Sequence, residues 1–380
     1  MKILVNAIPM TGLLTGIARY LRNLYHTIHG MGRADIRYFN GSCVVDAMPP
    51  MADAGRWQKT VGAVRYLPDH VIFGVRAARW MKYEYCLNRV CRNQTPGFSV
   101  YHETAFSPAK LTRVPTVFSI YDLSLRRYKE THPKERVLFF EYFIKTRLRY
   151  ARHILTISEF IRQEIISEFK VDPSMVTAVP LAADPVFTPA DKNVVATVRQ
   201  KYNLPPSYLL FVSSLEPRKN IDLLVDALAE TKTDIPIVLV GWKGWGEKSW
   251  FEKIRNKNLK NRVYITGHIP DHDLRAVYTG AQALIYPSLY EGFGLPIVEA
   301  MACGCPVICS NVSSMPEVAG DAAVLIDPRQ SSELAQAIET VVHDTGARTL
   351  LAEKGKARAL GFTWESTANQ TLDVYRNAAR

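Results

Sequence analysis

The 380-residue sequence has no long hydrophobic run and few cysteines. No stretch approaches the roughly 18 consecutive apolar residues of a transmembrane helix, and the first apolar segment, Lys2–Ala7, turns polar too early for a secretory signal. The six cysteines show no Cys-x-x-Cys framework, which favours reduced, mostly buried thiols: Cys43, Cys86, Cys91, Cys303, Cys305 and Cys309. We therefore expect a cytoplasmic protein without a disulfide framework.

Motifs for binding metal ions or nucleic acid are also missing. No Asp-x-Asp pair and no His/Cys cluster with metal-ligand spacing follows a predicted strand, so we expect neither a metal ion nor another cofactor. No helix-turn-helix, zinc or RNA-platform signature accompanies the basic residues. We therefore expect no nucleic-acid partner.

Acidic residues are scarce in the first half of the chain. Residues 1–185 hold 26 Lys and Arg against 15 Asp and Glu, whereas the remaining residues hold 21 of each, so the whole net charge of +11 lies in the first half. The charge is dense in Trp57–Arg92, where aromatic residues are interleaved, and in a predicted basic helix, Glu135–Arg152. Such segments fit helices on an anionic membrane surface, and they also fit helices whose arginines are merely solvated.

Short apolar runs alternate with helical periodicity in both halves. Strands are predicted at Lys2–Ala7, Thr116–Tyr121, His153–Ile157, Tyr208–Val212, Ile235–Val240, Val263–Thr266 and Ala283–Tyr286, and further helices at Thr15–His29 and Ile221–Glu230. This alternation predicts an α/β protein whose parallel sheets carry helices on both faces. Polar sequence at Ala182–Ser207 predicts a linker, which gives two doubly wound, Rossmann-like domains at 1–183 and 184–364.

The most informative string is Pro287–Gly304, PSLYEGFGLPIVEAMACG. A predicted strand runs into a Gly-bearing loop and then into a helix that begins near Pro296, where backbone N–H groups and the helix dipole suit a diphosphate. Glu291 and Glu299, eight residues apart, bracket the loop and can reach hydroxyl groups of the same ligand. The alternative is a structural strand–loop–helix with solvent-facing glutamates.

A second string, Leu215–Asn220 (LEPRKN), follows the predicted strand Tyr208–Val212. Arg218 offers a planar fork of donors and Lys219 a mobile point charge, and both can neutralise a diphosphate. Without a metal site, these two cations would stabilise the leaving group.

Together the two strings resemble the retaining glycosyltransferases of family 4, which have the two-domain GT-B fold. Weaker matches cover nearly the whole chain: Thr15–Tyr20, Val100–His102, Ile157–Phe160, Leu239–Trp245 and Thr266–Ile269. The resemblance implies metal-independent sugar transfer from a nucleotide-sugar donor with retention at the anomeric carbon. It also implies that a closing helix, Glu365–Ala379 within residues 365–380, packs back on the first domain.

The resemblance assigns roles by position. Arg218 and Lys219 would hold the donor diphosphate, Glu291 the transferred sugar, and Glu299 the ribose. Further donor contacts would come from Gly16, Ser213, His268, Ile269, Phe293, Gly294 and Leu295, and an acceptor contact from His102.

Two positions depart from the family pattern. Tyr121-Asp122, which we expect at the catalytic centre, stands where a His-Asp pair is common. A tyrosine titrates near pH 10, so Tyr121 can donate a hydrogen bond but cannot act as a base at neutral pH. Ser213 replaces a common Gly and would place a side chain near the donor.

The strings LEPRKN and Gly241–Trp245 most resemble mannosyl- and rhamnosyltransferases of bacterial surface polysaccharides. Among the candidate donors, GDP-mannose is preferred, UDP-glucose or UDP-N-acetylhexosamine comes next, and dTDP-rhamnose follows. The expected acceptor is a glycan or a lipid-linked sugar. The alternatives are a sugar-nucleotide epimerase on the same fold and a non-catalytic GT-B scaffold that binds membranes.

Overall fold

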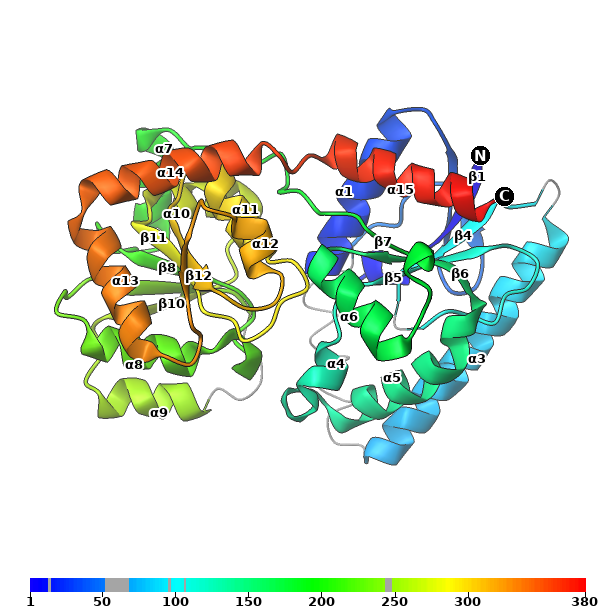
Figure 1. Cartoon of the computed structure of the whole chain (residues 1–380), viewed down its shortest axis with the longest axis horizontal. Helices are drawn as coiled ribbons and strands as arrows, with labels where there is room; N and C mark the ends of the chain where they lie inside the picture. The colour runs from blue at the N-terminus through cyan, green and yellow to red at the C-terminus, as the bar shows by residue number, and fades with distance from the viewer. Residues whose placement is uncertain (13–14, 52–67, 95–96, 106, 243–247) are drawn as a thin grey trace. The chain divides into compact units, whose positions relative to one another are not determined.

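The computed structural model describes residues 1–12, 15–51, 68–94, 97–105, 107–242 and 248–380, in two compact units (Figure 1). Unit 1 comprises Met1–Leu181 with Trp364–Arg380, and unit 2 comprises Ala182–Thr363. The sequence predicted the divisions at 183 and 364. The first part of the basic segment Trp57–Arg92, up to residue 67, and the motif residues Lys243–Trp245 lie outside the described residues.

In unit 1 the described strands form one sheet in the order β3-β2-β1-β4-β5-β6-β7. Their bounds are Lys2–Asn6 (β1), Asp35–Phe39 (β2), Val44–Val45 (β3), Val100–Glu103 (β4), Thr116–Ile120 (β5), Ala151–Thr156 (β6) and Val176–Ala178 (β7). All neighbours pair in parallel except β2 and β3. Strands β4 and β5 are buried along their whole length, which explains why such strands have no alternating polar pattern.

Helices cover both faces of this sheet. They are α1 (Gly16–Gly30), α3 (Asp69–Asn93), α4 (Ser124–Arg127), α5 (Lys134–Arg147), α6 (Glu159–Phe169) and α15 (Trp364–Ala378), with short 3-10 turns at Ile8–Met10, Lys129–Thr131, Leu148–Tyr150 and Pro173–Met175. Successive residues of a strand point to opposite faces. Tyr101 of β4 accordingly belongs to the core that includes Trp80 of α3, whereas His102 meets Tyr25 of α1 and Tyr375 of α15.

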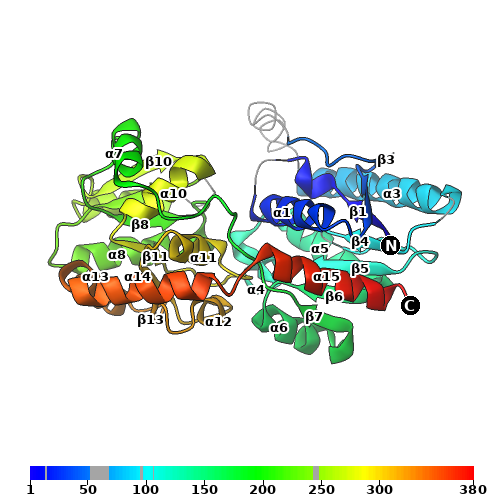
Figure 2. The same cartoon turned by 90° about the horizontal axis from the view of Figure 1, so that it is seen from above.

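The closing helix α15 returns to unit 1, in the position that the family resemblance implies. The Thr367 hydroxyl donates to the Pro180 carbonyl over 2.7 Å, and the Trp364 ring centroid lies 6.3 Å from that of Tyr20 in α1. Figure 2 shows α1 and α15 side by side. Residues from the two ends of the chain therefore share one core.

The predicted helix Glu135–Arg152 was too long. Helix α5 ends at Arg147, and Ala151 and Arg152 belong to β6. Ala151 is buried and pairs with Thr116 of β5, so sheet pairing determines the conformation where helical periodicity alone was indecisive.

Unit 2 contains, among its described residues, a fully parallel sheet in the order β10-β9-β8-β11-β12-β13. The strands are Leu209–Val212 (β8), Ile237–Val240 (β9), Val263–Gly267 (β10), Ala283–Tyr286 (β11), Val307–Ser310 (β12) and Val324–Ile326 (β13). The helices are α7 (Lys192–Lys201), α8 (Ile221–Glu230), α9 (Lys248–Asn256), α10 (Asp271–Gly280), α11 (Leu295–Ala302), α12 (Met315–Ala319), α13 (Ser331–His343) and α14 (Thr345–Ala359), with a 3-10 turn at Pro217–Lys219.

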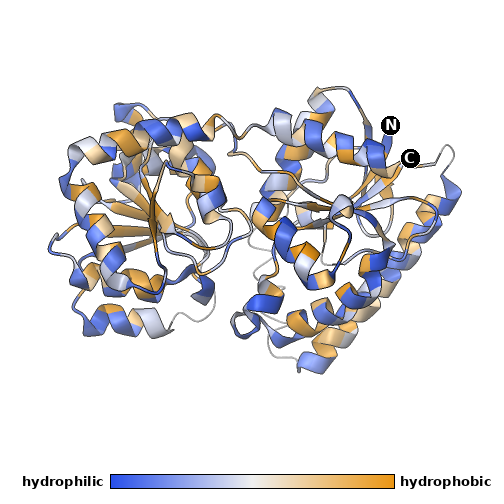
Figure 3. Ribbon diagram, in the orientation of Figure 1, coloured by the Kyte–Doolittle hydropathy of each residue, from blue (hydrophilic) through white to orange (hydrophobic). Residues whose placement is uncertain are grey.

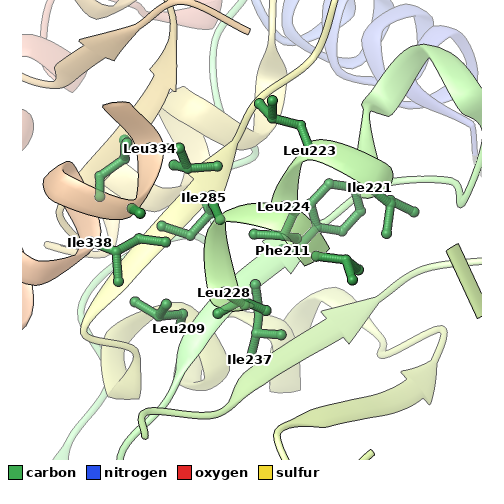
Figure 4. Packing of buried hydrophobic residues seen from close by; sticks show 14 of the residues in the cluster. Leu209, Phe211, Ile221, Leu223, Leu224, Leu228, Ile237, Ile285, Leu334 and Ile338 are labelled. Atoms are coloured by element: carbon green, nitrogen blue, oxygen red, sulfur yellow. The ribbon is translucent and has the colours of Figure 1, made fainter. Parts of the chain in front are cut away.

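Figure 4 shows the core on one face of this sheet, where Leu209, Phe211 and Ile285 meet side chains of α8 and α13. In Figure 3 the strands of unit 2 are coloured mainly as hydrophobic. The predicted α/β class is confirmed.

Three further findings complete the fold. The predicted linker Ala182–Ser207 contains helix α7, which the sequence did not indicate because Val198 is its only buried residue. Among the described residues, no helix is long and apolar enough to cross a membrane. All six cysteines are free thiols, with Cys91, Cys303, Cys305 and Cys309 buried.

Candidate active site

The two motif loops of unit 2 meet where the strand order reverses. Strands β8 and β11 are neighbours in the sheet although β9 and β10 lie between them in sequence, and ligands of doubly wound sheets bind at such a switch point. The loop after β8 carries Arg218, and the loop after β11 carries Glu291. The Leu289 N–H donates to the Arg218 carbonyl over 2.9 Å, and the Asn220 side chain donates to the Pro287 carbonyl over 3.1 Å. The two strings therefore form one site.

Four charged side chains form a buried cluster in this site. Arg218 donates through Nη2 to Glu216 Oε1 (2.9 Å) and through Nη1 to Glu291 Oε2 (3.4 Å). Lys219 Nζ donates to Glu291 Oε1 over 2.5 Å. All four residues are only 6–8% exposed. A charge buried away from water requires a partner of opposite charge, and here two cations pair with two carboxylates.

Glu216 was missed by the sequence analysis. It lies two residues before Arg218 in the string LEPRKN, and an acidic residue so close to Arg218 and Lys219 could have indicated an ion pair. In the structure it orients one edge of the guanidinium.

The ionisation of this cluster follows from its geometry. Burial alone would raise the pKa of Glu291, but Lys219 and Arg218 outweigh burial and hold that pKa at about 2. Burial and the like charge of Arg218 lower the pKa of Lys219, and the two carboxylates oppose that shift. Glu291 is therefore a carboxylate at neutral pH, which can accept hydrogen bonds from hydroxyl groups but cannot serve as a general acid.

Hydrogen bonds hold the backbone around Glu291. Its N–H donates to Ser313 Oγ over 3.0 Å, and its carbonyl accepts from Ser314 Oγ over 2.9 Å. Gly294, which precedes α11, has φ +99°, and a β-carbon there would lie 3.1 Å from Ile297 Cδ1. A glycine is required at this helix entry because side-chain-bearing residues rarely adopt such a φ.

The other residues of this loop are placed differently. The Phe293 side chain is buried edge-on against Phe362, with ring centroids 5.7 Å apart, so only its backbone can face a ligand. Leu295 is half-buried and is the first residue of α11.

Glu299 lies inside α11 and is 3% exposed. Since Glu291 is buried as well, the alternative in which both glutamates of the string merely face solvent is excluded. The Tyr278 hydroxyl, from α10, donates to Glu299 Oε2 over 2.9 Å. This bond fixes the orientation of the carboxylate.

Three further predicted donor contacts lie at strand ends of the same sheet. Ser213 follows β8 and is half-buried, and a β-carbon at Gly241 would lie 1.8 Å from the Ser213 carbonyl oxygen, so only glycine fits beside it. After β10, the His268 ring stacks on Trp242 with centroids 4.7 Å apart and planes 24° apart. Ile269 is 1% exposed, which leaves its backbone for any ligand contact.

Gly16, Tyr121 and Asp122 belong to unit 1. Gly16 is the exposed first residue of α1, directly after the capping residue Thr15. Asp122 Oδ1 accepts the Ser124 N–H over 2.8 Å. The Tyr121 hydroxyl donates to a backbone carbonyl, that of Thr104, over 3.2 Å. Burial raises the pKa of Tyr121 well above its usual value, so its hydroxyl stays protonated and can act only as a hydrogen-bonding group at neutral pH.

The prediction that His102 contacts the acceptor was wrong. Its side chain is 0% exposed, and both ring nitrogens are occupied. Nδ1 bonds the hydroxyls of Tyr25 and Tyr375, and Nε2 bonds Ser119 Oγ over 2.7 Å. Burial lowers the pKa of His102 to about 3, so it is a neutral core residue.

In the part of the chain that the structure describes, no three His, Cys, Asp or Glu side chains gather as metal ligands would. The residues that could meet a diphosphate are instead the cations Arg218 and Lys219 and the backbone at the start of α11.

Comparison with known proteins gives three relevant matches. The family model described as glycosyl transferases group 1 matches residues 195–358. The O-antigen chain mannosyltransferase B of Escherichia coli is 32% identical, over 99% of this chain and 100% of that protein. The serotype-specific mannosyltransferase WbdA of Escherichia coli is 30% identical over 64% of this chain, but that match spans only 31% of WbdA.

Solved structures give the same fold. The structure of Anabaena HepE in complex with UDP and glucose matches with a TM-score of 0.73 and 20% identity, over 99% of this chain and 100% of that one. At this identity the match shows the fold alone, which is GT-B.

Proposed function

The chain belongs to the glycosyl transferases group 1, and from that premise we propose that it is a retaining, metal-independent mannosyltransferase that uses GDP-mannose. Its acceptor in this proposal is a glycan or a lipid-linked sugar of a surface polysaccharide. Sugar transfer as such follows from the family. The choice of mannose is supported by the mannosyltransferase that matches along its full length.

The observation that carries the proposal is the buried cluster at the switch point of unit 2. Arg218 and Lys219 are already desolvated and held by Glu216 and Glu291, so they can meet a diphosphate with little reorganisation. When a donor binds, part of their hydrogen bonding shifts from the carboxylates to the phosphate oxygens. Charge that develops on the departing nucleoside diphosphate is then stabilised by the two cations.

The remaining roles follow from ionisation and position. Glu291, ionised at neutral pH, accepts hydrogen bonds from hydroxyls of the transferred sugar. Glu299, oriented by Tyr278, accepts them from the ribose. In a retaining transfer on one face of the sugar, the leaving phosphate takes the acceptor proton, so no protein base is needed.

The test is transfer by the purified full-length chain from GDP-mannose, UDP-glucose and dTDP-rhamnose to a mannose-terminated oligosaccharide, with the anomeric configuration of the product read by NMR. We expect α-linked mannose, unchanged rates with EDTA, and loss of transfer in Arg218→Ala. A product of inverted configuration would contradict retention, and a rate abolished by chelator would contradict metal independence. Full activity of Arg218→Ala would contradict the role of Arg218 in holding the diphosphate. Release of an altered sugar nucleotide without acceptor would instead identify the epimerase.

We also propose peripheral association with an anionic membrane surface, where a lipid-linked acceptor would be presented. The support is the charge distribution, because the whole net charge of +11 lies in the first 185 residues.

A further inference from the structure

The outward side of helix α3 has an unusual composition. Seven exposed residues recur there at alternating intervals of three and four: Val71, Val75, Ala78, Lys82, Tyr85, Arg89 and Arg92. The stripe is apolar near the start of the helix and basic near its end. Val75 is 51% exposed, Tyr85 67%, and Met81, on the adjacent row, 60%. A helix whose outward side served only solubility would not expose the apolar side chains of Val75, Met81 and Tyr85 to water.

Helix α5 continues this surface. Leu138 is 58% exposed and Tyr142 62% exposed, one turn apart. The two helices pack side by side through Trp80 of α3 against Phe139 and Phe143 of α5, with ring centroids 6.3 and 6.2 Å apart. Their outward sides therefore border each other, and Figure 3 shows hydrophobic and hydrophilic turns interleaved on both.

Of the four carboxylates on α3 and α5, all except the exposed Asp69 at the start of α3 are engaged with other cations. Glu84 pairs with Arg147 over 2.6 Å, and Glu135 pairs with Arg76 over 3.4 Å. Glu141 pairs with Arg126 over 3.7 Å and with Lys145 over 3.6 Å.

Within the described residues, five exposed basic side chains of this surface have no carboxylate oxygen within 4.0 Å: Arg79, Lys82, Arg89, Arg92 and Lys134. The interpretation in which local carboxylates merely neutralise the basic side chains therefore fails for these five.

We propose that this α3–α5 face, formed by these five cations together with Val71, Val75, Met81, Tyr85, Leu138 and Tyr142, docks on an anionic lipid bilayer. The cations meet lipid phosphates, while the aliphatic and aromatic side chains enter the interfacial layer. A nucleic acid would satisfy the cations but leave the apolar side chains in water. The assignment rests on the proposed peripheral association and is independent of the donor.

The experiment is co-sedimentation of the full-length chain with phosphatidylcholine vesicles and with vesicles that also contain phosphatidylglycerol. The test variant combines Lys82→Gln, Arg89→Gln and Arg92→Gln. Its matched control combines Lys192→Gln, Arg255→Gln and Lys260→Gln, which remove the same charge from exposed positions of unit 2.

Each basic residue near an anionic surface contributes about a fivefold change in partitioning. We therefore expect the test variant to bind anionic vesicles on the order of 100-fold more weakly, and the control variant to bind like the wild type. At high salt the charges are screened, and the vesicle binding that remains depends on the apolar side chains. The double variant Val75→Ser with Leu138→Ser should weaken this remaining binding. Thermal unfolding and mannosyl transfer to a soluble acceptor should be unchanged in all variants.

The outcomes separate the proposals. No wild-type binding to anionic vesicles, or equal binding to neutral ones, would refute peripheral association itself. If the wild type binds anionic vesicles and the test and control variants bind them equally well, the assignment to the α3–α5 face is refuted but peripheral association is not. Loss of duplex DNA binding in the test variant, without loss of vesicle binding, would assign the face to nucleic acid and overturn the proposal. None of these results bears on sugar transfer to a soluble acceptor.

Discussion

Replacing Lys219 by Met tests whether the buried cluster works as one electrostatic unit. The substitution keeps most of the length of the side chain but removes its charge, so Arg218, at 3.4 Å, remains as the one cationic partner of Glu291 among the described residues. Breaking a buried ion pair by removing one partner costs about 3–5 kcal/mol. The pKa of Glu291, which Lys219 and Arg218 together lower from 4.5 to about 2 against the effect of burial, points in the same direction.

This cost of about 3–5 kcal/mol translates into a measurable shift of melting temperature. For domains of the size of unit 2, Ala182–Thr363, a change of 1 kcal/mol moves Tm by about 2–4 °C, so we expect Lys219→Met to lower Tm by about 6–20 °C. Glu291→Gln should lower it less, because the neutral amide still accepts a hydrogen bond from Lys219. The double variant leaves no unpaired charge and should recover much of the loss, while Arg218 keeps Glu216 at 2.9 Å.

The assay is scanning calorimetry of the wild type, both single variants and the double variant, with turnover measured in parallel. Turnover should fall by about 100-fold or more in both single variants, since each removes a contact to the donor. Lys253→Met is the control, because Lys253 pairs with Asp226 over 2.6 Å on the partly exposed surface of the same unit, where such pairs contribute at most about 1 kcal/mol. A Tm of Lys219→Met equal to that of the control, or strictly additive losses in the double variant, would refute the reasoning.

Three further predictions concern single residues. Glu299→Ala should weaken nucleoside diphosphate binding by about 100-fold, whereas Glu291→Ala should mainly lower turnover; equal loss of affinity by calorimetric titration would contradict this division. Tyr278→Phe removes the hydrogen bond to Glu299 and should raise Kd about tenfold with kcat nearly unchanged, so a change confined to kcat would count against a positioning role. Because the pKa of His102 is lowered from 6.5 to about 3, the unfolded chain binds the extra proton, and stability should fall as pH drops below about 6.5, by about 2 kcal/mol at pH 5. In His102→Gln the dependence of Tm on pH between 6.5 and 5 should flatten, and an unchanged slope would exclude His102 as its source.

The sequence predicted the fold class well because buried parallel strands appear as continuous apolar runs that need no partner to be recognised. It also predicted which two loops carry the site, since both strings combine a strand end with residues that suit a diphosphate. Their meeting depends on the order β8-β11 in the sheet, which a single strand does not encode.

Other features required knowledge of neighbours in space. His102 resembled a ligand-binding residue because nothing local shows that Tyr25 and Tyr375 enclose it. The end of α5 depended on the pairing of Ala151 with β5, which helical periodicity cannot reveal. Glu216 was overlooked for the opposite reason, because an acidic residue within a cationic motif has no evident role until its bond to Arg218 is seen.

The return of α15 to unit 1 has a consequence for synthesis on the ribosome. Unit 2 is continuous in sequence and can fold as soon as Thr363 has emerged. Unit 1 cannot be completed then, since Tyr375, which bonds both Tyr25 and His102, is translated after the whole of unit 2. While unit 2 is being synthesised, Met1–Leu181 therefore waits with the apolar groove for α15 open and with His102 lacking its bond to Tyr375. A nascent chain that stalls or is cleaved before Trp364 should engage chaperones through that groove, while its second domain is already native.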